Sequence, residues 1–292
     1  MVTPIEASTV AAKLASLQAL GLERLDAQLL LLHVLQHDPH NPAHDRAYDH
    51  AHDRAWLLAH DTDLLSHPVQ ANLNALAARR LAGEPLAYIT GHKEFYGLNL
   101  RVDARVLDPR ADTETLVDWA LEVLAPHVGG SVMDLGTGSG AIALALKFTR
   151  PDLRVSALDF SNDALLVAKA NADRLQLDVQ FQQGSWLQGA AGQFQAIVAN
   201  PPYIASADRH LAALVHEPLQ ALASGVDGLD DIRSIIDQAP VHLLPGGCLL
   251  LEHGYDQASA VQGLLEAAGF TQVQSRRDLA GIARCSGGVW AA

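Results

Sequence analysis

A glycine-rich turn between an apolar strand and an apolar helix constrains the fold of this chain more than any other sequence feature. The turn reads Asp134-Leu-Gly-Thr-Gly-Ser-Gly140, follows Val132 and Met133, and precedes an apolar run that begins at Ala141. Three alternating glycines let the backbone turn sharply and approach a ligand closely, where a Cβ would collide. The segment therefore predicts a strand, a ligand-binding turn and a helix in succession.

Strand and helix patterns alternate after Pro109, with helices expected from Ala141 and Asp163. Strands are expected at residues 132–135, 155–159, 179–181, 196–199 and 248–252. Helical crossovers between strands predict an α/β fold with a mostly parallel, doubly wound sheet. Residues 271–275 and 283–290 have strand patterns with no helix between them. These two segments therefore predict an antiparallel pair at one edge of the sheet.

Two further regions precede the α/β part. Apolar residues recur at intervals of three and four between residues 4 and 81, as in Leu25, Leu29 and Leu32, which predicts helices. Between residues 83 and 109, aromatic and alternating residues are bounded by glycine and proline, which predicts a short β-hairpin. We therefore expect a helical domain at residues 1–82, a β-hairpin linker at 83–108 and an α/β domain at 109–292.

A histidine-rich insert interrupts the helical region at about residues 38–53, where Ala43-His-Asp-Arg-Ala47 is repeated as Ala51-His-Asp-Arg-Ala55. Histidine-rich tracts can bind metal. A short duplication in a surface loop explains the same residues, because loops tolerate insertions. We therefore predict no metal site. The histidines outside this tract that we interpret as surface or loop residues are His92, His210, His216 and His253.

Charge and cysteine content narrow the class of protein. The chain has 33 acidic residues against 20 basic ones, a net charge of −13 that repels polyphosphate and disfavours a nucleic acid partner. Only Cys248 and Cys285 occur, which fits a reducing compartment. The first residues lack a signal-peptide pattern, and the apolar runs are too short to span a membrane. We expect a cytoplasmic protein without a membrane partner.

The strand after the glycine turn ends in Asp159, about 20 residues beyond Gly140, where an acid can accept both hydroxyls of a ribose. Geometry alone leaves the cofactor open, because dinucleotide-binding enzymes use a related turn with Gly-x-Gly-x-x-Gly spacing. This chain has Gly-x-Gly-x-Gly instead. It also has Asp134, which would repel a pyrophosphate but could pair with the ammonium of a methionine moiety. Both points favour S-adenosylmethionine over NAD.

Asn200, Pro201, Pro202 and Tyr203 follow the fourth expected strand, at the edge where doubly wound folds bind ligands. The two prolines fix φ and remove two N–H donors, so nearby carbonyls stay free to accept hydrogen bonds. The Asn200 amide complements a planar group that has both C=O and NH₂, such as a carboxamide or an adenine edge. Tyr203 supplies an aromatic face for that plane. These four residues are therefore the predicted substrate-binding and catalytic residues.

The chemistry that these residues favour is methylation of an amide or exocyclic amine. Such a nitrogen is a poor nucleophile because its lone pair is delocalised. Hydrogen bonds to the Asn200 side chain and to a carbonyl near Pro201 would orient the lone pair toward a sulfonium methyl. Holding the two atoms at near-attack distance accounts for roughly 7–11 kcal/mol of barrier lowering. The proton can leave after transfer, so no strong base is needed.

Together these residues resemble the bacterial release factor glutamine methyltransferase family, which uses S-adenosylmethionine to methylate the glutamine of a Gly-Gly-Gln motif. Nearly the whole chain takes part in the resemblance. The segments that match are residues 79–91, Phe95-Tyr-Gly, 107–114, Glu217-Pro-Leu and Leu251-Glu-His-Gly254. The resemblance implies a Rossmann-like class I methyltransferase domain at residues 109–292 and a small N-terminal helical domain that recognises the substrate. The implied partners are class 1 peptide chain release factors, and the implied product is S-adenosylhomocysteine.

The resemblance also implies roles for individual residues. Trp186 would flank the adenine, and residues 200–203 would receive the glutamine, with Asn200 also near the cofactor. The turn residues and the acid that would hold the cofactor are Asp134, Gly136, Thr137, Gly138, Ser139, Gly140 and Asp159. The chain departs from the family pattern at three positions. Ser185 stands where the family usually has Asp, and Asp108 and Ala111 replace an apolar residue and a proline.

Three alternatives remain open. The first is methylation of adenine in DNA or RNA, which the net charge of −13 disfavours. The second is methylation of glutamine in a ribosomal protein, which the segment Asp112-Thr-Glu114 and the N-terminal region disfavour. The third is a binding module without activity, which only Ser185 supports.

Overall fold

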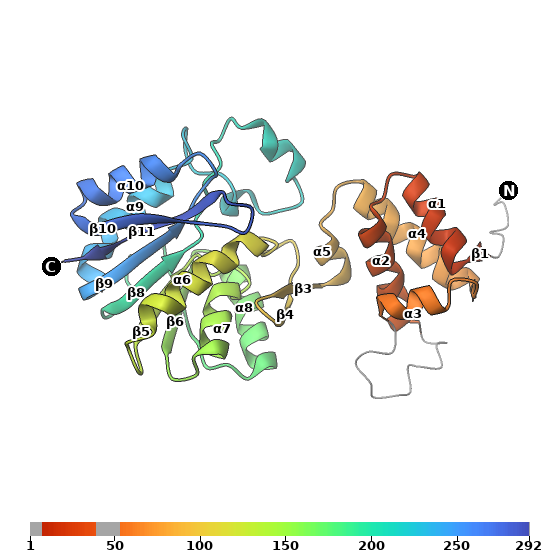
Figure 1. Ribbon diagram of the computed structural model, residues 1–292, viewed down its shortest axis with the longest axis horizontal. Coiled ribbons are helices and arrows are strands. Elements are labelled where there is room, and N and C mark those ends of the chain that lie inside the picture. The colour runs from red at the N-terminus through yellow and green to blue at the C-terminus, as the bar shows by residue number, and fades with distance from the viewer. Residues whose placement is uncertain (1–7, 39–52, 292) are drawn as a thin grey trace. The chain divides into compact units, whose positions relative to one another are not determined.

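The computed structural model describes residues 8–38 and 53–291, and the chain divides into two compact units, Met1–Gly91 and His92–Ala292 (Figure 1). Most of the predicted histidine-rich insert, residues 39–52, lies outside the described residues. Among the residues that are described, no helix is both long and apolar enough to cross a bilayer.

The first unit consists mainly of helices, as the apolar spacing predicts. They are α1 (Val10–Ala19), α2 (Arg24–Gln36), α3 (Arg54–Ala59), α4 (His67–Leu81) and α5 (Leu86–Thr90), with a short antiparallel pair of β1 (Ser8–Thr9) and β2 (Leu64–Leu65). The side chains of Thr9, Asp53 and Ser66 cap α1, α3 and α4 by accepting hydrogen bonds from backbone amides. Leu31 and Leu73 are fully buried in the core of this unit.

The predicted hairpin is confirmed for β3 (His92–Phe95) and β4 (Leu98–Arg101), which pair antiparallel and belong to the second unit. The part of the prediction that covers residues 86–90 is wrong, because these residues form α5. Pro85 precedes the helix, where its missing N–H costs no hydrogen bond. Gly91 ends it with a left-handed φ of +77°.

The second unit contains a sheet of seven strands in the order β10-β11-β9-β8-β5-β6-β7. The strands are β5 (Ser131–Leu135), β6 (Arg154–Asp159), β7 (Gln180–Gln183), β8 (Phe194–Ala199), β9 (Leu243–Glu252), β10 (Phe270–Arg277) and β11 (Ala283–Trp290). The strands from β9 to β7 in this order are parallel, whereas β11 is antiparallel to both β9 and β10. The doubly wound sheet and its antiparallel edge pair are thus confirmed.

Helices cover both faces of this sheet (Figure 1). One face carries α6 (Glu114–Leu124), α7 (Ala141–Thr149) and α8 (Asn162–Leu175), and the other carries α9 (Asp230–Gln238) and α10 (Ala258–Ala267). Four short 3₁₀ helices complete the unit: η2 (Ala111–Thr113), η3 (Arg209–Ala213), η4 (Leu219–Ala221) and η5 (Ala239–His242). The segments that follow β5, β6 and β8 therefore begin at the carboxyl ends of these strands.

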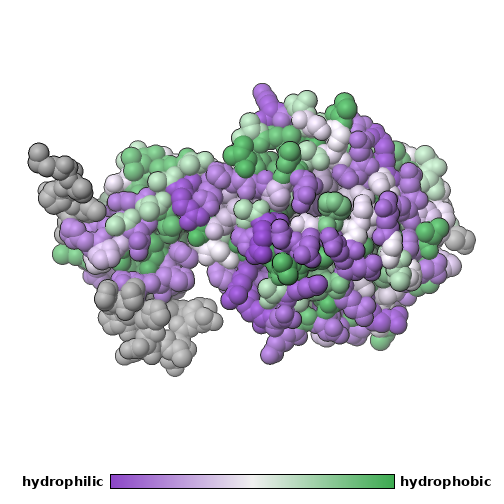
Figure 2. Space-filling view, turned by 180° about the vertical axis from the view of Figure 1, so that it is seen from behind, coloured by the Kyte–Doolittle hydropathy of each residue, from purple (hydrophilic) through white to green (hydrophobic). Residues whose placement is uncertain are grey.

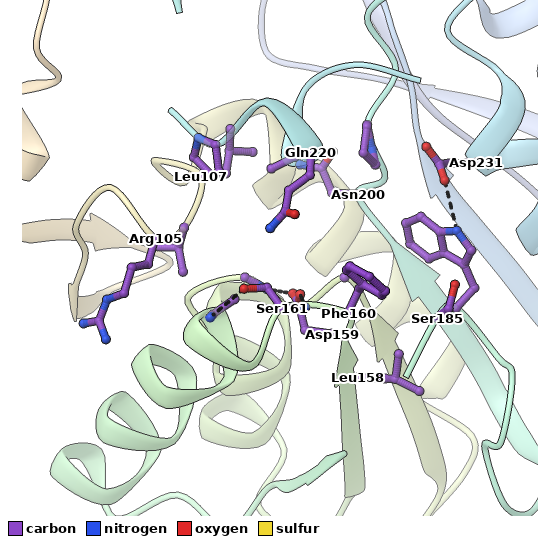
Figure 3. Close-up of a pocket in the computed structure, with 18 residues that line it drawn as sticks. Arg105, Leu107, Leu158, Asp159, Phe160, Ser161, Ser185, Asn200, Gln220 and Asp231 are labelled. Carbon is purple, nitrogen blue, oxygen red and sulfur yellow. Dashed lines mark hydrogen bonds between the residues drawn. The ribbon is translucent and has the colours of Figure 1, made fainter. Parts of the chain in front are cut away.

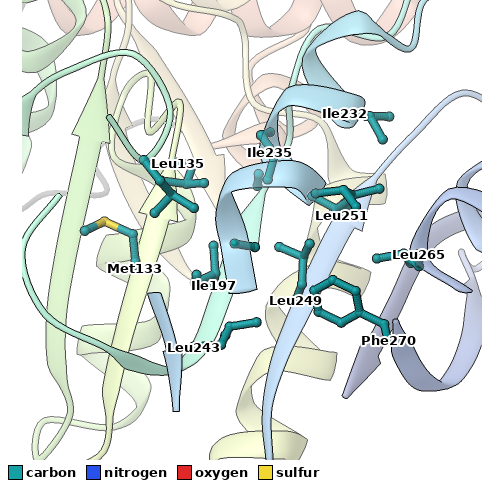
Figure 4. Close-up of a cluster of buried hydrophobic side chains, with 14 of the residues drawn as sticks. Met133, Leu135, Ile197, Ile232, Ile235, Leu243, Leu249, Leu251, Leu265 and Phe270 are labelled. Carbon is teal, nitrogen blue, oxygen red and sulfur yellow. The ribbon is translucent and has the colours of Figure 1, made fainter. Parts of the chain in front are cut away.

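Alternation along the central strands explains how both faces are buried. Met133, Leu135 and Ile197 point to the side of α9 and α10, where they pack with Ile235 and Leu249 (Figure 4). The intervening residues of the same strands point to the opposite face. Strands that are apolar on both faces need helices on both sides, which is why the parallel sheet forms a three-layer structure.

His253 corrects an interpretation made from the sequence. We expected it on the surface or in a loop, but it is fully buried beside β11. Its Nε2 lies 2.7 Å from Ser286 Oγ, and its Nδ1 lies 2.9 Å from the Gly254 carbonyl oxygen. Burial lowers the pKa of His253. The residue directly follows β9, and one of its two polar partners, Ser286, lies on the neighbouring strand β11, which a single sequence does not reveal.

Candidate active site

The glycine-rich turn connects β5 to α7 at the carboxyl end of the sheet. Gly136, Gly138 and Gly140 have φ angles of +66°, +56° and +86°, which side chains with a Cβ rarely adopt. A Cβ added at Gly140 would lie 3.0 Å from Leu144 Cδ1, and one at Gly136 would lie 3.4 Å from the Trp186 ring. The turn therefore needs glycine for both its backbone conformation and its close contacts.

Asp134 lies buried beneath this turn. Its Oδ2 accepts hydrogen bonds from the Thr137 hydroxyl at 2.7 Å and from the Ala143 amide at 3.2 Å, whereas its Oδ1 has no partner among the described residues. Burial raises the pKa of Asp134 to about 7, against the effect of these two hydrogen bonds. Thr137 and Ser139 are also buried. That these residues and Gly140 contact a cofactor stays a prediction.

A cavity lies at the carboxyl ends of β5, β6 and β8 (Figure 3). The predicted site residues that line it are Gly136, Gly138, Asp159, Trp186, Asn200 and Pro202. Asp159 accepts hydrogen bonds from the Gly138 and Ser161 amides, each at 2.8 Å. Burial raises the pKa of Asp159, and the two amide bonds oppose that effect. Each carboxylate oxygen keeps a further lone pair, so Asp159 can still accept a hydrogen bond from a ligand.

Trp186 forms part of the cavity wall with its indole held in place. Its φ is +51°, and its Nε1 donates a hydrogen bond to Asp231 Oδ1 on α9 at 3.0 Å (Figure 3). Ser185, which stands where the resembling family has Asp, lines the same cavity. An indole fixed at its polar end presents a flat apolar surface, on which an aromatic ring can pack.

Asn200 follows β8 directly, as the sequence predicts for the end of the fourth parallel strand. Its Nδ2 donates a hydrogen bond to Thr113 Oγ1 at 3.1 Å. Pro201 and Pro202 are buried, and Pro202 lines the cavity. Tyr203 is partly buried and faces a second, neighbouring cavity. Burial, followed by the charge of a nearby carboxylate, raises the pKa of Tyr203.

This second cavity shares part of its lining with the first. Its lining residues are Leu107, Arg110, Asn200, Tyr203, Ile204, Leu214, Ala221 and Leu222. Asn200, Leu107 and Ala221 line both cavities. Asn200 therefore lies where a ligand in the first cavity would meet a group entering through the second. An amide at this point can contact both.

Charged pairs hold the segment that carries Arg110. Its Nη2 lies 2.6 Å from Glu217 Oε1, and Glu217 Oε2 accepts a hydrogen bond from the Asp108 amide at 3.2 Å. Asp108, which replaces an apolar residue of the family pattern, is buried and forms ion pairs with Lys93 at 3.2 Å and with Arg110 at 3.3 Å. The substitution therefore adds charge pairs to this segment.

Sequence reasoning missed four residues near the cavity. Phe160 and Gln220 line it, and the Gln220 side chain points into it (Figure 3). Phe160 directly follows Asp159 and could have been found from that position. Thr113 lies in the matching segment 107–114, but its contact with Asn200, 87 residues away, could not be read from that segment. Asp231 gave no signal, because it is 45 residues from its partner Trp186.

The cavity fits a cofactor that combines a ribose, an aromatic base and a charged amino acid end. Asp159 can accept from hydroxyls, and Trp186 can pack on the base. The Oδ1 of Asp134 is buried beneath the turn and has no hydrogen-bond partner among the described residues, and Asp134 does not line the cavity; that it pairs with an ammonium group stays a prediction. Among residues 8–38 and 53–291, no group of three or more His, Cys, Asp or Glu side chains is arranged to hold a metal ion.

Comparisons with known proteins also point to a methyltransferase. Two family models match the chain, the PrmC N-terminal domain at residues 10–91 and the methyltransferase small domain at residues 113–227. The release factor glutamine methyltransferase of Bordetella pertussis is 47% identical over 272 residues, which are 92% of this chain and 95% of that protein. The release factor glutamine methyltransferase of Coxiella burnetii is 45% identical over 263 residues, which are 89% of this chain and 90% of that protein.

A solved methyltransferase from Pyrococcus furiosus is similar in fold. Its TM-score is 0.52 at 19% identity, and the match covers 74% of this chain and 98% of that one. At this identity the likeness supports the methyltransferase fold of the sheet and says nothing about the substrate.

Proposed function

Because this chain belongs to the release factor glutamine methyltransferase family, we infer that it is a protein methyltransferase that modifies a glutamine side chain. We propose that it transfers a methyl group from S-adenosylmethionine to the amide nitrogen of the glutamine in the Gly-Gly-Gln motif of class 1 release factors. The observation that carries this proposal is the position of Asn200, which lines both the cofactor cavity and the neighbouring one.

We assign the cofactor to the cavity beside the glycine-rich turn. Asp159 would bind the ribose hydroxyls, Trp186 would pack on the adenine, and the turn at Gly136 and Gly138 lets the backbone approach. When bound, S-adenosylmethionine supplies an electrophilic methyl group on a sulfonium and leaves as S-adenosylhomocysteine. Asp134 would pair with the ammonium of the methionine moiety.

We assign the glutamine side chain to the second cavity, next to Asn200. The Asn200 Oδ1 would accept one hydrogen of the substrate NH₂, and a main-chain carbonyl near Pro201 would accept the other. These two acceptors orient the nitrogen lone pair toward the methyl group and hold the reacting atoms close. The nitrogen becomes cationic on transfer and then loses a proton, so the chain needs no strong base here.

Surface residues next to the cavities support a protein substrate over a nucleic acid. Pro218, Gln220 and Ala221 line the first cavity, and the neighbouring Val215 and Leu219 are 72% and 63% exposed. Figure 2 shows hydrophobic side chains gathered on the viewed face over the segment that carries η3 and η4. Exposed apolar side chains of this kind are typical of protein interaction sites. The net charge of −13 disfavours a polyphosphate backbone.

The experiment that tests the proposal is transfer of a labelled methyl group from S-adenosylmethionine to a purified class 1 release factor. The same factor with its Gly-Gly-Gln glutamine changed to alanine is the matched control. We expect label on the unchanged factor alone. A ribosomal protein and an adenine-containing DNA are assayed beside it.

Each other result contradicts a different part of the proposal. Equal label on the glutamine-to-alanine factor would show that the acceptor is another residue. Label on the ribosomal protein alone would replace the release factor as substrate. Label on the DNA would contradict the argument from charge. Cofactor binding without transfer to any of them would indicate a binding module.

A further inference from the structure

The segment from Asn200 to Tyr203 is held at its start and at its end by different contacts. At its start it continues β8, and Asn200 donates a hydrogen bond to Thr113 at 3.1 Å. Pro201 and Pro202 have no N–H, so the middle of the segment cannot be held by amides of its own. The position of the proposed acceptor carbonyl near Pro201 therefore depends also on what holds the end of the segment at Tyr203.

Gln257, which directly precedes α10, holds that end. Its Nε2 donates hydrogen bonds to the Tyr203 carbonyl at 3.0 Å and to the Asp227 carbonyl at 3.2 Å. Its Oε1 accepts a hydrogen bond from the Gly254 amide at 2.8 Å. A carboxamide NH₂ has two hydrogens to donate, and its oxygen donates none. A reversed amide would place the oxygen against two carbonyls and the NH₂ against an N–H, so the three contacts fix one orientation of the side chain.

Gly228 shows that the main chain lies close to Tyr203 on the side of Gln257. Its φ is +77°, and a Cβ added there would lie 2.2 Å from the Tyr203 carbonyl oxygen and 2.8 Å from Gln257 Nε2. A side chain at this position would have to displace the Tyr203 main chain. The next residue, Ile204, forms a parallel β-bridge with Ala223. Residues 223–228 thus lie against the end of the Asn-Pro-Pro-Tyr segment, and Gln257 joins the two.

Gln257 lines neither of the two cavities, whereas Tyr203 lines the second. Its effect on the reaction must therefore pass through the segment that it holds. We propose that Gln257 is a positioning residue, which fixes the main chain at Tyr203 and thereby places the Tyr203 ring and the carbonyl near Pro201 where the glutamine NH₂ binds. This inference rests on the proposed function, because the segment that Gln257 holds is the one assigned to the glutamine.

The first test is Gln257→Met in the full-length protein, with a class 1 release factor as substrate. Methionine has a side chain of similar length and removes all three hydrogen bonds. At saturating cofactor we expect kcat to fall about 5- to 20-fold, because the Tyr203 carbonyl loses its donor. The KM for the release factor and the Kd for S-adenosylhomocysteine should each stay within about twofold. A general loosening of the fold would instead lower the melting temperature and weaken cofactor binding as well.

Two further variants separate the donors of Gln257 from its acceptor. Gln257→Glu keeps an acceptor for the Gly254 amide. Its carboxylate has no hydrogen to donate to the Tyr203 and Asp227 carbonyls. Gln257→Lys keeps donors for both carbonyls and loses the acceptor. Since the Tyr203 carbonyl is the group that needs a donor, we expect kcat of Gln257→Lys to exceed that of Gln257→Glu by at least about threefold.

Gly228→Ala provides an independent arm, because its methyl group displaces the same main chain without changing Gln257. The matched control is Gly246→Ala, since Gly246 has a φ of +80° and no atom within 4 Å of the added Cβ. Both variants should lose stability, because alanine disfavours a left-handed φ. Only Gly228→Ala should also lose kcat, by about tenfold. Melting temperatures of all variants separate this loss from unfolding.

Three results would overturn the inference. The first is a wild-type kcat in Gln257→Met. The second is an equal kcat in Gln257→Glu and Gln257→Lys, which would assign the effect to the Gly254 contact or to packing. The third is an equal kcat in Gly228→Ala and Gly246→Ala, which would show that the reaction does not depend on the position of the Tyr203 main chain. A wild-type protein that methylates no release factor contradicts the proposed function itself, and the inference with it.

Discussion

The glycine-rich turn on the proposed cofactor side and Asn200 on the proposed acceptor side of the candidate active site are held in place by different kinds of contact. On the cofactor side, Gly136, Gly138 and Gly140 set the shape of the turn through their left-handed φ angles, and Asp159 accepts hydrogen bonds from the main-chain amides of Gly138 and Ser161. On the acceptor side, Asn200 donates a hydrogen bond to Thr113, which is 87 residues away along the chain. Arg110 similarly pairs with Glu217 across 107 residues.

The first kind of contact is determined by a short segment of sequence, whereas the second requires the whole domain to be folded. Glycine backbone angles and a strand-to-helix turn follow from local sequence. Side chains that meet from distant segments are correctly placed only once the sheet has formed. Substitutions on the cofactor side should therefore weaken cofactor binding. Substitutions on the acceptor side should lower the rate of methyl transfer and leave cofactor binding intact.

The largest effect is expected for Asn200→Ala. In the proposed arrangement Asn200 Oδ1 accepts from the substrate nitrogen, so its removal should lower kcat by about 100- to 1,000-fold, because the lone pair would no longer be oriented toward the methyl group. The Kd for S-adenosylhomocysteine should change by no more than a few-fold. Methyl transfer and calorimetric binding measure the two quantities. A tenfold or greater loss of cofactor affinity would contradict the separation of the two sides.

The converse change is Asp159→Ala. Loss of charge-assisted hydrogen bonds should raise the Kd for the cofactor by about 10- to 100-fold, partly because the Gly138 and Ser161 amides also lose their acceptor. At saturating cofactor, kcat should stay near that of the wild type. Asp159→Asn keeps the shape and one acceptor, so its Kd should lie between the two. An unchanged Kd in Asp159→Ala would refute the ribose assignment.

The same division explains how much the sequence predicted. The glycine turn, the succession of strands and helices along the chain and the placement of Asn200 after the fourth parallel strand depend on local patterns, and the structure confirms them. Thr113, Asp231 and the burial of His253 depend on contacts between segments far apart in the chain. Helix α5 was missed because a proline and a glycine around five residues fit a turn as well as a short helix.

A pH experiment tests whether Asp134 belongs to the cofactor side at all, since it is buried and does not line the cavity. Its pKa of about 7 means that it is mostly protonated at pH 6. Pairing with an ammonium requires the carboxylate, so affinity for S-adenosylhomocysteine should rise about fivefold from pH 6 to pH 7. An α-ammonium stays mostly charged over this range. Calorimetry at the two pH values measures the change.

Asp134→Asn is the control, because it keeps an acceptor for Thr137 and Ala143 and cannot ionise. Its affinity should be nearly constant between the two pH values. The unliganded wild type should show the opposite trend in stability. A carboxyl whose pKa is raised in the folded state stabilises the fold at low pH, and that contribution is lost as the pH rises through 7. A flat wild-type affinity would place Asp134 outside the cofactor contacts.

The smallest effect on cofactor binding is expected for Gly136→Ala, which is compared with Gly97→Ala to separate backbone strain from a change in the shape of the cavity. Gly136 and Gly97 have similar φ angles of +66° and +76°, and only at Gly136 would a Cβ meet a neighbour, the Trp186 ring at 3.4 Å. Both Gly→Ala variants should lose about 1–2 kcal/mol of the free energy of unfolding, because alanine disfavours a left-handed φ. Only Gly136→Ala should also weaken cofactor binding, by about two- to threefold, since its methyl group enters the cavity wall. Denaturant unfolding and calorimetry on the two variants measure both quantities. Equal Kd values would mean that the glycine at position 136 serves the turn alone, and that the cofactor does not approach the backbone there.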